Sequence, residues 1–138
     1  MDNEQMGRRN REEGAWGEST AADFLVAKGW RIVARNARPC ARDRRCEIDI
    51  IAEPGEPGKV VFVEVKTHAG PTVAGRLAGV DARKKQNLLR ACASWVMRNR
   101  WHGDFRFDVV EVYGAQGEVA AIDHIENVPL FPPKWRFW

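Results

Sequence analysis

The chain has 138 residues and a mass of 15.7 kDa, with 44% hydrophobic and 30% charged residues, which fits one globular domain and excludes wholesale disorder. No apolar run approaches the ~18 residues of a transmembrane helix, and the first fifteen residues carry seven charges where a secretory signal has an apolar core. The three cysteines are sparse and odd in number, so we expect a reduced, cytoplasmic protein that has no membrane partner.

Positive charge is concentrated in one part of the chain, although the formal net charge is only +3. Arginine outnumbers lysine sixteen to six, and the arginine segment, residues 31–45, contains a single acid. The arginines of this segment are Arg31, Arg35, Arg38, Arg42, Arg44 and Arg45. Guanidinium groups match phosphate oxygens, so the segment indicates a polyanionic partner. Taken alone, such a cluster is more often a solvated surface loop.

The N-terminal third is expected to contain a disordered arm and one helix. Residues 1–11 are polar and lack an apolar period, which is typical of a disordered arm. A helix over residues 12–28 is predicted, because Glu18, Ala21, Ala22 and Leu25 fall at helical spacing and Gly29 is a suitable stop.

The rest of the chain predicts five strands and a second helix. The strands are expected at residues 30–34, 46–52, 59–66, 107–113 and 119–125, with a Gly-rich loop at 68–79 and the helix at 81–99. The order α-β-β-β-α-β-β, with the first three strands as a meander, indicates an α/β domain built on a mixed sheet flanked by helices. We place this single domain at residues 12–126, followed by an irregular, proline-containing tail at 127–138.

Side-chain alternation predicts where the acids of two strands point. In 59–66, Glu64 and Lys66 share a face with Phe62, and three valines occupy the other face. In 46–52, Glu47 and Asp49 lie opposite Ile48 and Ile50. We therefore expect the branched aliphatic residues to form one buried face of the sheet, with the charged residues together on the second face.

If these two strands pair, Asp49 and Glu64 approach each other. Two close carboxylates repel unless a cation lies between them, and Mg²⁺ or Mn²⁺ needs only one or two carboxylates with waters and a phosphate. The Val65 carbonyl is a natural additional metal ligand. Lys66 is then suited to orienting an attacking water or offsetting charge in the transition state.

Each predicted helix carries one charged residue at the end of its apolar stripe, Glu18 in the first and Lys84 in the second. Gly14 and Gly17 would let the first helix approach the sheet closely. Taken singly, each charged residue is more often a rim residue, and Glu-x-Lys on a strand is more often a solvated face. Their joint occurrence indicates convergence on one cavity and favours a nuclease arrangement.

The pattern of residues 14–36, 46–52, 61–67, 80–96 and 106–110 resembles the YraN-like family of small bacterial proteins. That family is similar to the restriction-endonuclease-like, PD-(D/E)XK superfamily and, within it, to Holliday-junction resolvases. The resemblance covers about residues 14–125 and implies a restriction-endonuclease-like mixed sheet of about five strands.

The resemblance also implies a set of site residues. Glu18 matches the glutamate of the family's N-terminal Gly-Glu, Asp49 the aspartate of its Glu-Ile-Asp, and Glu64 and Lys66 its Glu-x-Lys. Lys84 matches the lysine that opens the second helix, and residues 106–108 match an Arg-Phe-Asp segment. This chain departs from the family pattern in having Cys46 where a glycine is usual, and in a longer loop at 38–45.

Three functions are compatible with these features. The first is a divalent-metal-dependent nuclease acting on DNA, with branched DNA among its substrates and a two-fold homodimer as the expected form for a resolvase. The second is a nucleic-acid-binding module of the same fold without turnover; Arg35, Arg38, Arg42, Arg44 and Arg45 would contact phosphates in either case. The third is a protein-interaction role through Trp135, Phe137 and Trp138 of the tail, although such a tail more often covers a core edge.

The histidines and cysteines give weaker indications of a functional site. His68 closely follows the Glu-x-Lys strand and could touch a phosphate, although a loop histidine is usually solvated. Neither His102 nor His124 has metal-ligand spacing with the cysteines, and Cys40 and Cys46 have no second pair to complete a zinc site.

Overall fold

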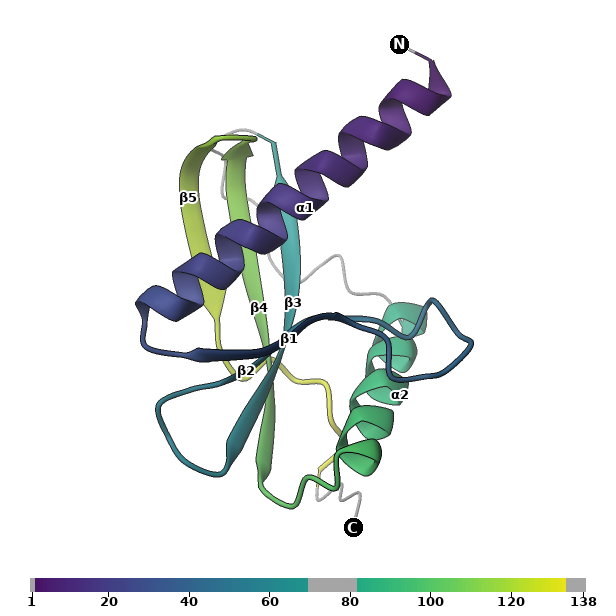
Figure 1. The fold of residues 1–138 in the computed structure, drawn as a ribbon, viewed down its shortest axis with the longest axis vertical. Helices are drawn as coiled ribbons and strands as arrows, with labels where there is room; N and C mark the ends of the chain where they lie inside the picture. Colours follow the sequence, from purple (N-terminus) through teal and green to yellow (C-terminus); the bar gives the residue numbers. More distant parts are fainter. Residues whose placement is uncertain (1, 70–81, 134–138) are drawn as a thin grey trace.

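The protein is described by a computed structural model that covers residues 2–69 and 82–133 (Figure 1). Its elements follow the predicted order: α1 (Asn3–Ala27), β1 (Arg31–Ala37), β2 (Ile48–Glu53), β3 (Lys59–His68), α2 (Ala82–Arg98), β4 (Asp104–Ala115) and β5 (Glu118–Ile125). The predicted α/β class with a mixed sheet flanked by helices is confirmed.

The five strands form one sheet in the order β1-β2-β3-β4-β5. Strands β3 and β4 are parallel, and the other three pairs are antiparallel. Parallel neighbours need a crossover connection, and α2 lies within it. The first three strands form the expected meander.

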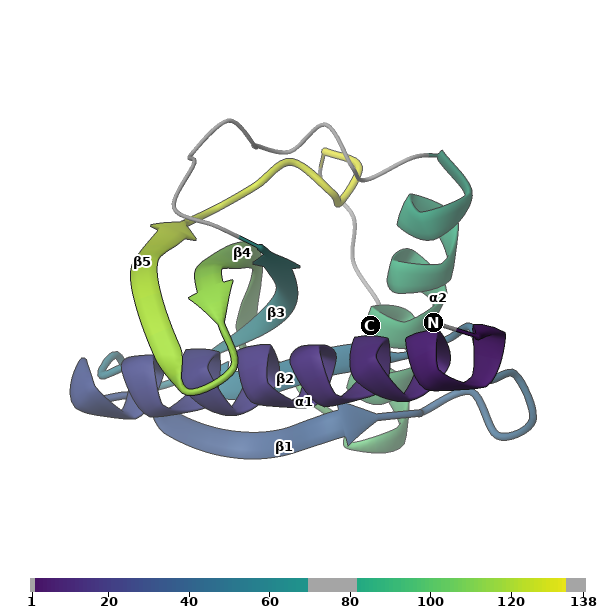
Figure 2. The same cartoon turned by 90° about the horizontal axis from the view of Figure 1, so that it is seen from above.

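Both faces of the sheet are buried, each under one helix, as the view from above shows (Figure 2). The face under α1 contains Ala21, Ala22, Leu25, Ile50, Ala52, Val61, Val63, Val110 and Val112. The face under α2 contains Ile48, Ile51, Val60, Phe62, Leu88, Cys92, Trp95, Val96, Phe107 and Val109 among others. The prediction of a single buried aliphatic face is therefore wrong.

Two residues show why that prediction failed. Phe62, on the face expected to be charged, is fully buried and packs edge-to-face against Trp95, with ring centroids 5.6 Å apart. Ile48 belongs to the cluster under α2, while Ile50 belongs to the cluster under α1, although strict alternation gives them one face. Strand β2 departs from regular alternation where its pairing with β3 ends.

The N-terminal boundary of α1 also differs from the prediction, because the helix begins at Asn3 and not at residue 12. Asp2 caps it by accepting a hydrogen bond from the Gln5 N–H at 2.7 Å. This part of α1 projects beyond the sheet in Figure 1 and has no apolar stripe to bury, so periodicity could not reveal it. Residues 3–11 are thus helical, where a disordered arm was expected.

One of the two glycines expected to permit close packing does so. A Cβ atom on Gly17 would lie 2.0 Å from Thr67 Oγ1, so only glycine lets α1 approach β3 at this point. Around Gly14, by contrast, a Cβ atom would meet nothing within 4 Å, and its expected role is wrong.

The segment after β5 closes one edge of the core. Val128 N–H donates to the Phe107 carbonyl at 2.7 Å, Leu130 is buried, and Phe131 packs edge-to-face on Phe105 and Phe62. The tail aromatics Trp135, Phe137 and Trp138, and residues 70–79 of the expected Gly-rich loop, lie outside the described residues. Within the described part of the chain, no helix is long and apolar enough to cross a membrane.

Candidate metal and nucleic-acid site

Asp49 lies where β2 separates from β3. Strands β2 and β3 are paired from Ala52–Val61 to Ile50–Val63. Asp49 is the residue just before Ile50 in the chain, so it lies directly beyond the last pair. Its carboxylate Oδ2 accepts a hydrogen bond from the Val65 backbone N–H at 2.8 Å. The side chain is thus fixed beside β3, next to the position of Glu64, and Glu64 is itself only 4% exposed.

The surroundings of Asp49 disfavour its charged form. Burial and, next in size, the charge of the neighbouring Glu64 raise the pKa of Asp49 to about 8. The charges of Glu18 and Glu47 make smaller contributions in the same direction, and the hydrogen bond from the Val65 N–H opposes them. Four carboxylates from α1, β2 and its entrance, and β3 therefore lie within electrostatic reach of one another.

Helix α1 contributes Glu18 to this group. Its pKa is raised by burial first, then by the Glu47 charge, with a smaller contribution from Glu64. Arg35 and a hydrogen bond with Asn36 lower the pKa of Glu18. Asn36 has a φ of 52°, a left-handed conformation that asparagine tolerates better than most residues. The end of β1 thus supplies a side-chain hydrogen bond to Glu18.

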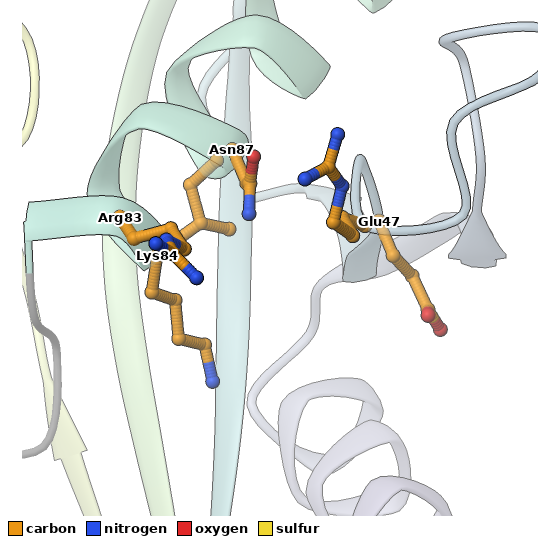
Figure 3. A pocket seen from close by; sticks show the side chains of 6 residues that line it. Glu47, Arg83, Lys84 and Asn87 are labelled. Atoms are coloured by element: carbon orange, nitrogen blue, oxygen red, sulfur yellow. The ribbon is translucent and has the colours of Figure 1, made fainter.

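Lys84 at the start of α2 forms an ion pair with Glu64. It also lines a pocket of about 290 Å³ together with Arg45, Glu47, Arg83, Asn87 and Leu88. Figure 3 shows this pocket between the first turns of α2 and the entrance to β2. A carboxylate and three cationic side chains line one opening, which suits a polyanion bound beside a carboxylate-held cation.

Lys66 and Val65 occupy the expected places on β3, but neither is fully buried. Lys66 shares the face of Glu64 and aligns with Glu111 on β4. The structure therefore brings Glu18, Asp49, Glu64 and Lys84 into one neighbourhood and sets Lys66 one step farther along β3. Which of these residues are catalytic or bind metal stays a prediction.

The part of the arginine segment that follows β1, residues 38–45, is held against α2, whereas Arg31 and Arg35 belong to β1. Asp43 accepts from Arg45 at 3.0 Å and from Arg90 at 2.8 Å, and these bonds hold its pKa below the usual range. Arg98 donates to the Pro39 carbonyl at 2.6 Å. The segment is thus anchored to α2 through several residues, which differs from a freely solvated loop.

The arginines of this segment have different surroundings. Arg35 donates to Ser19 Oγ at 3.1 Å, and Arg38 lies 3.7 Å from a Glu47 carboxylate oxygen. Arg42 and Arg44 are exposed and line a second pocket of about 360 Å³, formed by residues 38 and 40–44. Arg45 lines the pocket beside Lys84.

The cysteines differ from the expected fully reduced state. Cys40 and Cys46 are joined by a disulfide, with Cα atoms 5.8 Å apart, within the range that a disulfide can span. This bond closes the turn that carries Arg42, Arg44 and Arg45. Cys92 is a buried thiol whose pKa is raised by burial.

A second polar cluster lies on the α1 face and was not predicted. Ligand atoms of Asp108, His124 and Glu126 lie within 4.8 Å of one another. The Asp108 carboxylate already accepts two bonds from Arg106, at 2.8 and 2.9 Å, and pairs with His124 at 2.8 Å. Lys28 Nζ lies 2.8 Å from His124 Nδ1. With two cationic side chains in place, this cluster is a structural ion-pair network. In the sequence, the signal for this cluster is Asp108, an acid within the apolar run of β4.

The sequence pattern of the uncharacterised protein family UPF0102 matches residues 17–112, and the chain belongs to this family. A UPF0102 protein of Trichlorobacter lovleyi is 37% identical over 123 residues, covering 88% of this chain and 93% of the relative. A UPF0102 protein of Mycolicibacterium smegmatis is 38% identical over 118 residues, covering 85% and 92%. The UPF0102 protein STH1475 of Symbiobacterium thermophilum is 43% identical over 104 residues, covering 75% and 83%. Membership in this family of small bacterial proteins, expected from the sequence, is thereby confirmed.

Proposed function

We propose that this member of the UPF0102 family is a divalent-metal-dependent nuclease that hydrolyses phosphodiester bonds in DNA, with branched or structured DNA among its substrates. The observation that carries the proposal is the juxtaposition of Asp49 and Glu64 at the fork between β2 and β3. We extend to this chain the similarity of its family to the PD-(D/E)XK superfamily and to Holliday-junction resolvases.

The residues present fit a hard divalent cation. Asp49 and Glu64 supply carboxylate oxygens, and the Val65 carbonyl is the backbone oxygen between Glu64 and Lys66. Burial and mutual repulsion raise the pKa of Asp49, and a cation bound between the two carboxylates would relieve that repulsion. When bound, Mg²⁺ or Mn²⁺ supplies phosphate polarisation and a bound water that ionises more readily.

The remaining residues bind and orient the substrate. Lys66 offsets negative charge that develops on the phosphate or orients the attacking water. Glu18, whose pKa is raised by burial, is a further ligand or proton acceptor beside these carboxylates. Arg35, Arg38, Arg42, Arg44 and Arg45 would contact the DNA backbone on either side of the site, and the disulfide limits the movement of the last three.

The proposal is tested by calorimetric titration with Mg²⁺ and Mn²⁺ together with cleavage assays on linear, flapped and four-way DNA of matched sequence. We expect wild-type protein to bind metal and cut at least one structure, and Asp49→Asn to lose both properties. Asp23→Asn, which changes an exposed acid of α1, is the matched control and should retain both. Wild-type protein that binds no divalent ion and leaves every substrate intact would contradict the proposal.

A second function is favoured by the Lys84–Glu64 ion pair. Lys84 supplies Glu64 with a counter-charge, so the charge of this carboxylate is balanced without a divalent cation. A nucleic-acid-binding module without turnover would bind DNA in a salt-dependent way and show no divalent-metal requirement.

A further inference from the structure

A second buried carboxylate lies on the same sheet face as Glu64, farther along the strands. The Glu111 side chain is only 1% exposed. Its Oε1 lies 3.3 Å from His68 Nε2, and its Oε2 accepts a hydrogen bond from the Tyr113 hydroxyl at 3.2 Å. The His68 and Tyr113 rings are stacked, with centroids 4.8 Å apart and an interplanar angle of 20°.

The parallel register aligns this group with the candidate metal site. Glu64 pairs with Val109, Lys66 with Glu111, and His68 with Tyr113. Alternate residues of a strand share a face, so Glu64, Lys66 and His68 form a row with successive Cα atoms about 6.6 Å apart. His68 is therefore a residue of β3, not of the loop in which it was expected.

The environment of His68 restricts the ring far more than a solvated position would. Its Nε2 faces a buried carboxylate, one ring face lies on Tyr113, and the side chain is still 35% exposed. Because Nε2 faces Glu111, Nδ1 is the ring nitrogen left for a ligand, and a histidine ring can donate from both nitrogens. Burying the Glu111 carboxylate costs free energy of folding, and its contact with a partly exposed histidine does little to recover that cost. The arrangement therefore points to a ligand that the histidine binds.

We propose that His68 binds a backbone phosphate of the DNA strand, the second one along from the phosphate that a metal at Asp49 and Glu64 would hold, and that Glu111 and Tyr113 position its ring. The spacing of alternate residues along β3 is comparable to that of successive phosphates along a DNA strand, so the row Glu64, Lys66, His68 can follow the backbone. This inference rests on the proposed function for its substrate class, but not for cleavage.

The test measures the affinity for a short four-way DNA as a function of salt concentration, in EDTA, so that neither metal nor turnover contributes. We expect His68→Gln to weaken binding roughly tenfold and to lower the salt slope by about one unit. His102→Gln, which changes an exposed histidine after α2, is the matched control and should leave both values unchanged. An unchanged affinity and slope in His68→Gln would overturn the inference.

The positioning role is tested by a double-mutant cycle. Glu111→Gln should weaken DNA binding in the presence of His68 and have no further effect in the His68→Gln background. Equal effects of Glu111→Gln in both backgrounds would contradict positioning. Since Glu111 is buried and its variant can lose stability, His68→Gln alone decides the phosphate contact. A wild-type protein that binds DNA in EDTA but never cuts it would refute the nuclease proposal and leave this inference standing.

Discussion

The Asp49 carboxylate accepts a hydrogen bond from the Val65 N–H at 2.8 Å, so a side chain of β2 bonds to the backbone of β3 at the point where the two strands separate. This bond holds Asp49 beside Glu64 although burial and the repulsion between the two charges raise the pKa of Asp49. Placing two acids so close costs stability, and proteins retain such costs at functional sites.

The first prediction concerns pH. An aspartate has a pKa near 4 when unfolded, whereas that of Asp49 is about 8 in the folded protein. Between these values the folded state binds more protons than the unfolded state, so stability falls as the pH rises. We expect metal-free protein to be more stable at pH 5 than at pH 8, with Asp49 contributing about 3–4 kcal/mol of this difference.

Thermal unfolding in EDTA at several pH values measures this dependence. Asp49→Asn should flatten it, and Mg²⁺ should raise the melting temperature of the wild type mainly above pH 7, where Asp49 loses its proton. A wild type whose pH dependence matches that of Asp49→Asn would show that Asp49 has an ordinary pKa.

The second prediction separates two roles within the site. Asp49→Asn should reduce metal affinity and cleavage together, because the amide cannot replace the charge of a ligand. Lys66→Ala should spare metal binding and lower the cleavage rate by about 10²–10³, the effect of removing one electrostatic interaction from the transition state. Calorimetry and single-turnover cleavage report the two effects separately. Two variants that both retain wild-type metal binding and cleavage would remove these residues from the site.

The third prediction concerns the arginine segment. Changing Arg42, Arg44 and Arg45 to glutamate should weaken DNA binding and lower its salt slope by about one unit for each phosphate that is no longer neutralised. The segment should stay docked, because the bonds from Arg90 to Asp43 and from Arg98 to Pro39 remain. Arg8→Glu, on the projecting part of α1, is the control. Binding that is insensitive to the triple change would identify these arginines as solvated surface residues.

Much of the fold could be predicted because strand alternation and helix periodicity are local properties. The element order, the meander and the inward stripe of Ala21, Ala22 and Leu25 follow from spacing alone. The burial of Phe62 could not be predicted in the same way, because it depends on α2 packing against the face that also carries Glu64. A sheet covered on both sides loses the polar and apolar alternation that reveals an exposed face.

Part of the candidate site could likewise be predicted from the sequence, and part of it could not. Asp49, Glu64 and Lys84 could be proposed from their positions on strands and at a helix start. Glu111 was missed because FDVVEVY reads as an apolar strand, although an acid within such a run is a signal in itself. Its contacts with His68 and Tyr113 depend on the parallel register of β3 and β4, which spans a connection of 35 residues (69–103).

The last prediction tests how α1 brings Glu18 to the sheet. A Cβ atom on Gly17 would lie 2.0 Å from Thr67 Oγ1 and 3.2 Å from Thr67 Cβ, so Gly17→Ala forces α1 away from β3. We expect a loss of about 1–3 kcal/mol of stability, with weaker metal binding if the helix carries Glu18 away from Asp49 and Glu64. Thr67→Ala removes the closest atom, so the double variant should recover most of the loss.

Gly14→Ala provides the control for this prediction, because it lies on the same helix with nothing within 4 Å of its added Cβ atom. There, the helix propensity of alanine should stabilise the protein by about 0.5–1 kcal/mol. Chemical denaturation of the four variants measures the differences directly. Equal stability gains in Gly17→Ala and Gly14→Ala would mean that α1 does not touch β3 at Thr67. A Gly17→Ala loss that Thr67→Ala fails to relieve would place the close contact elsewhere on the helix.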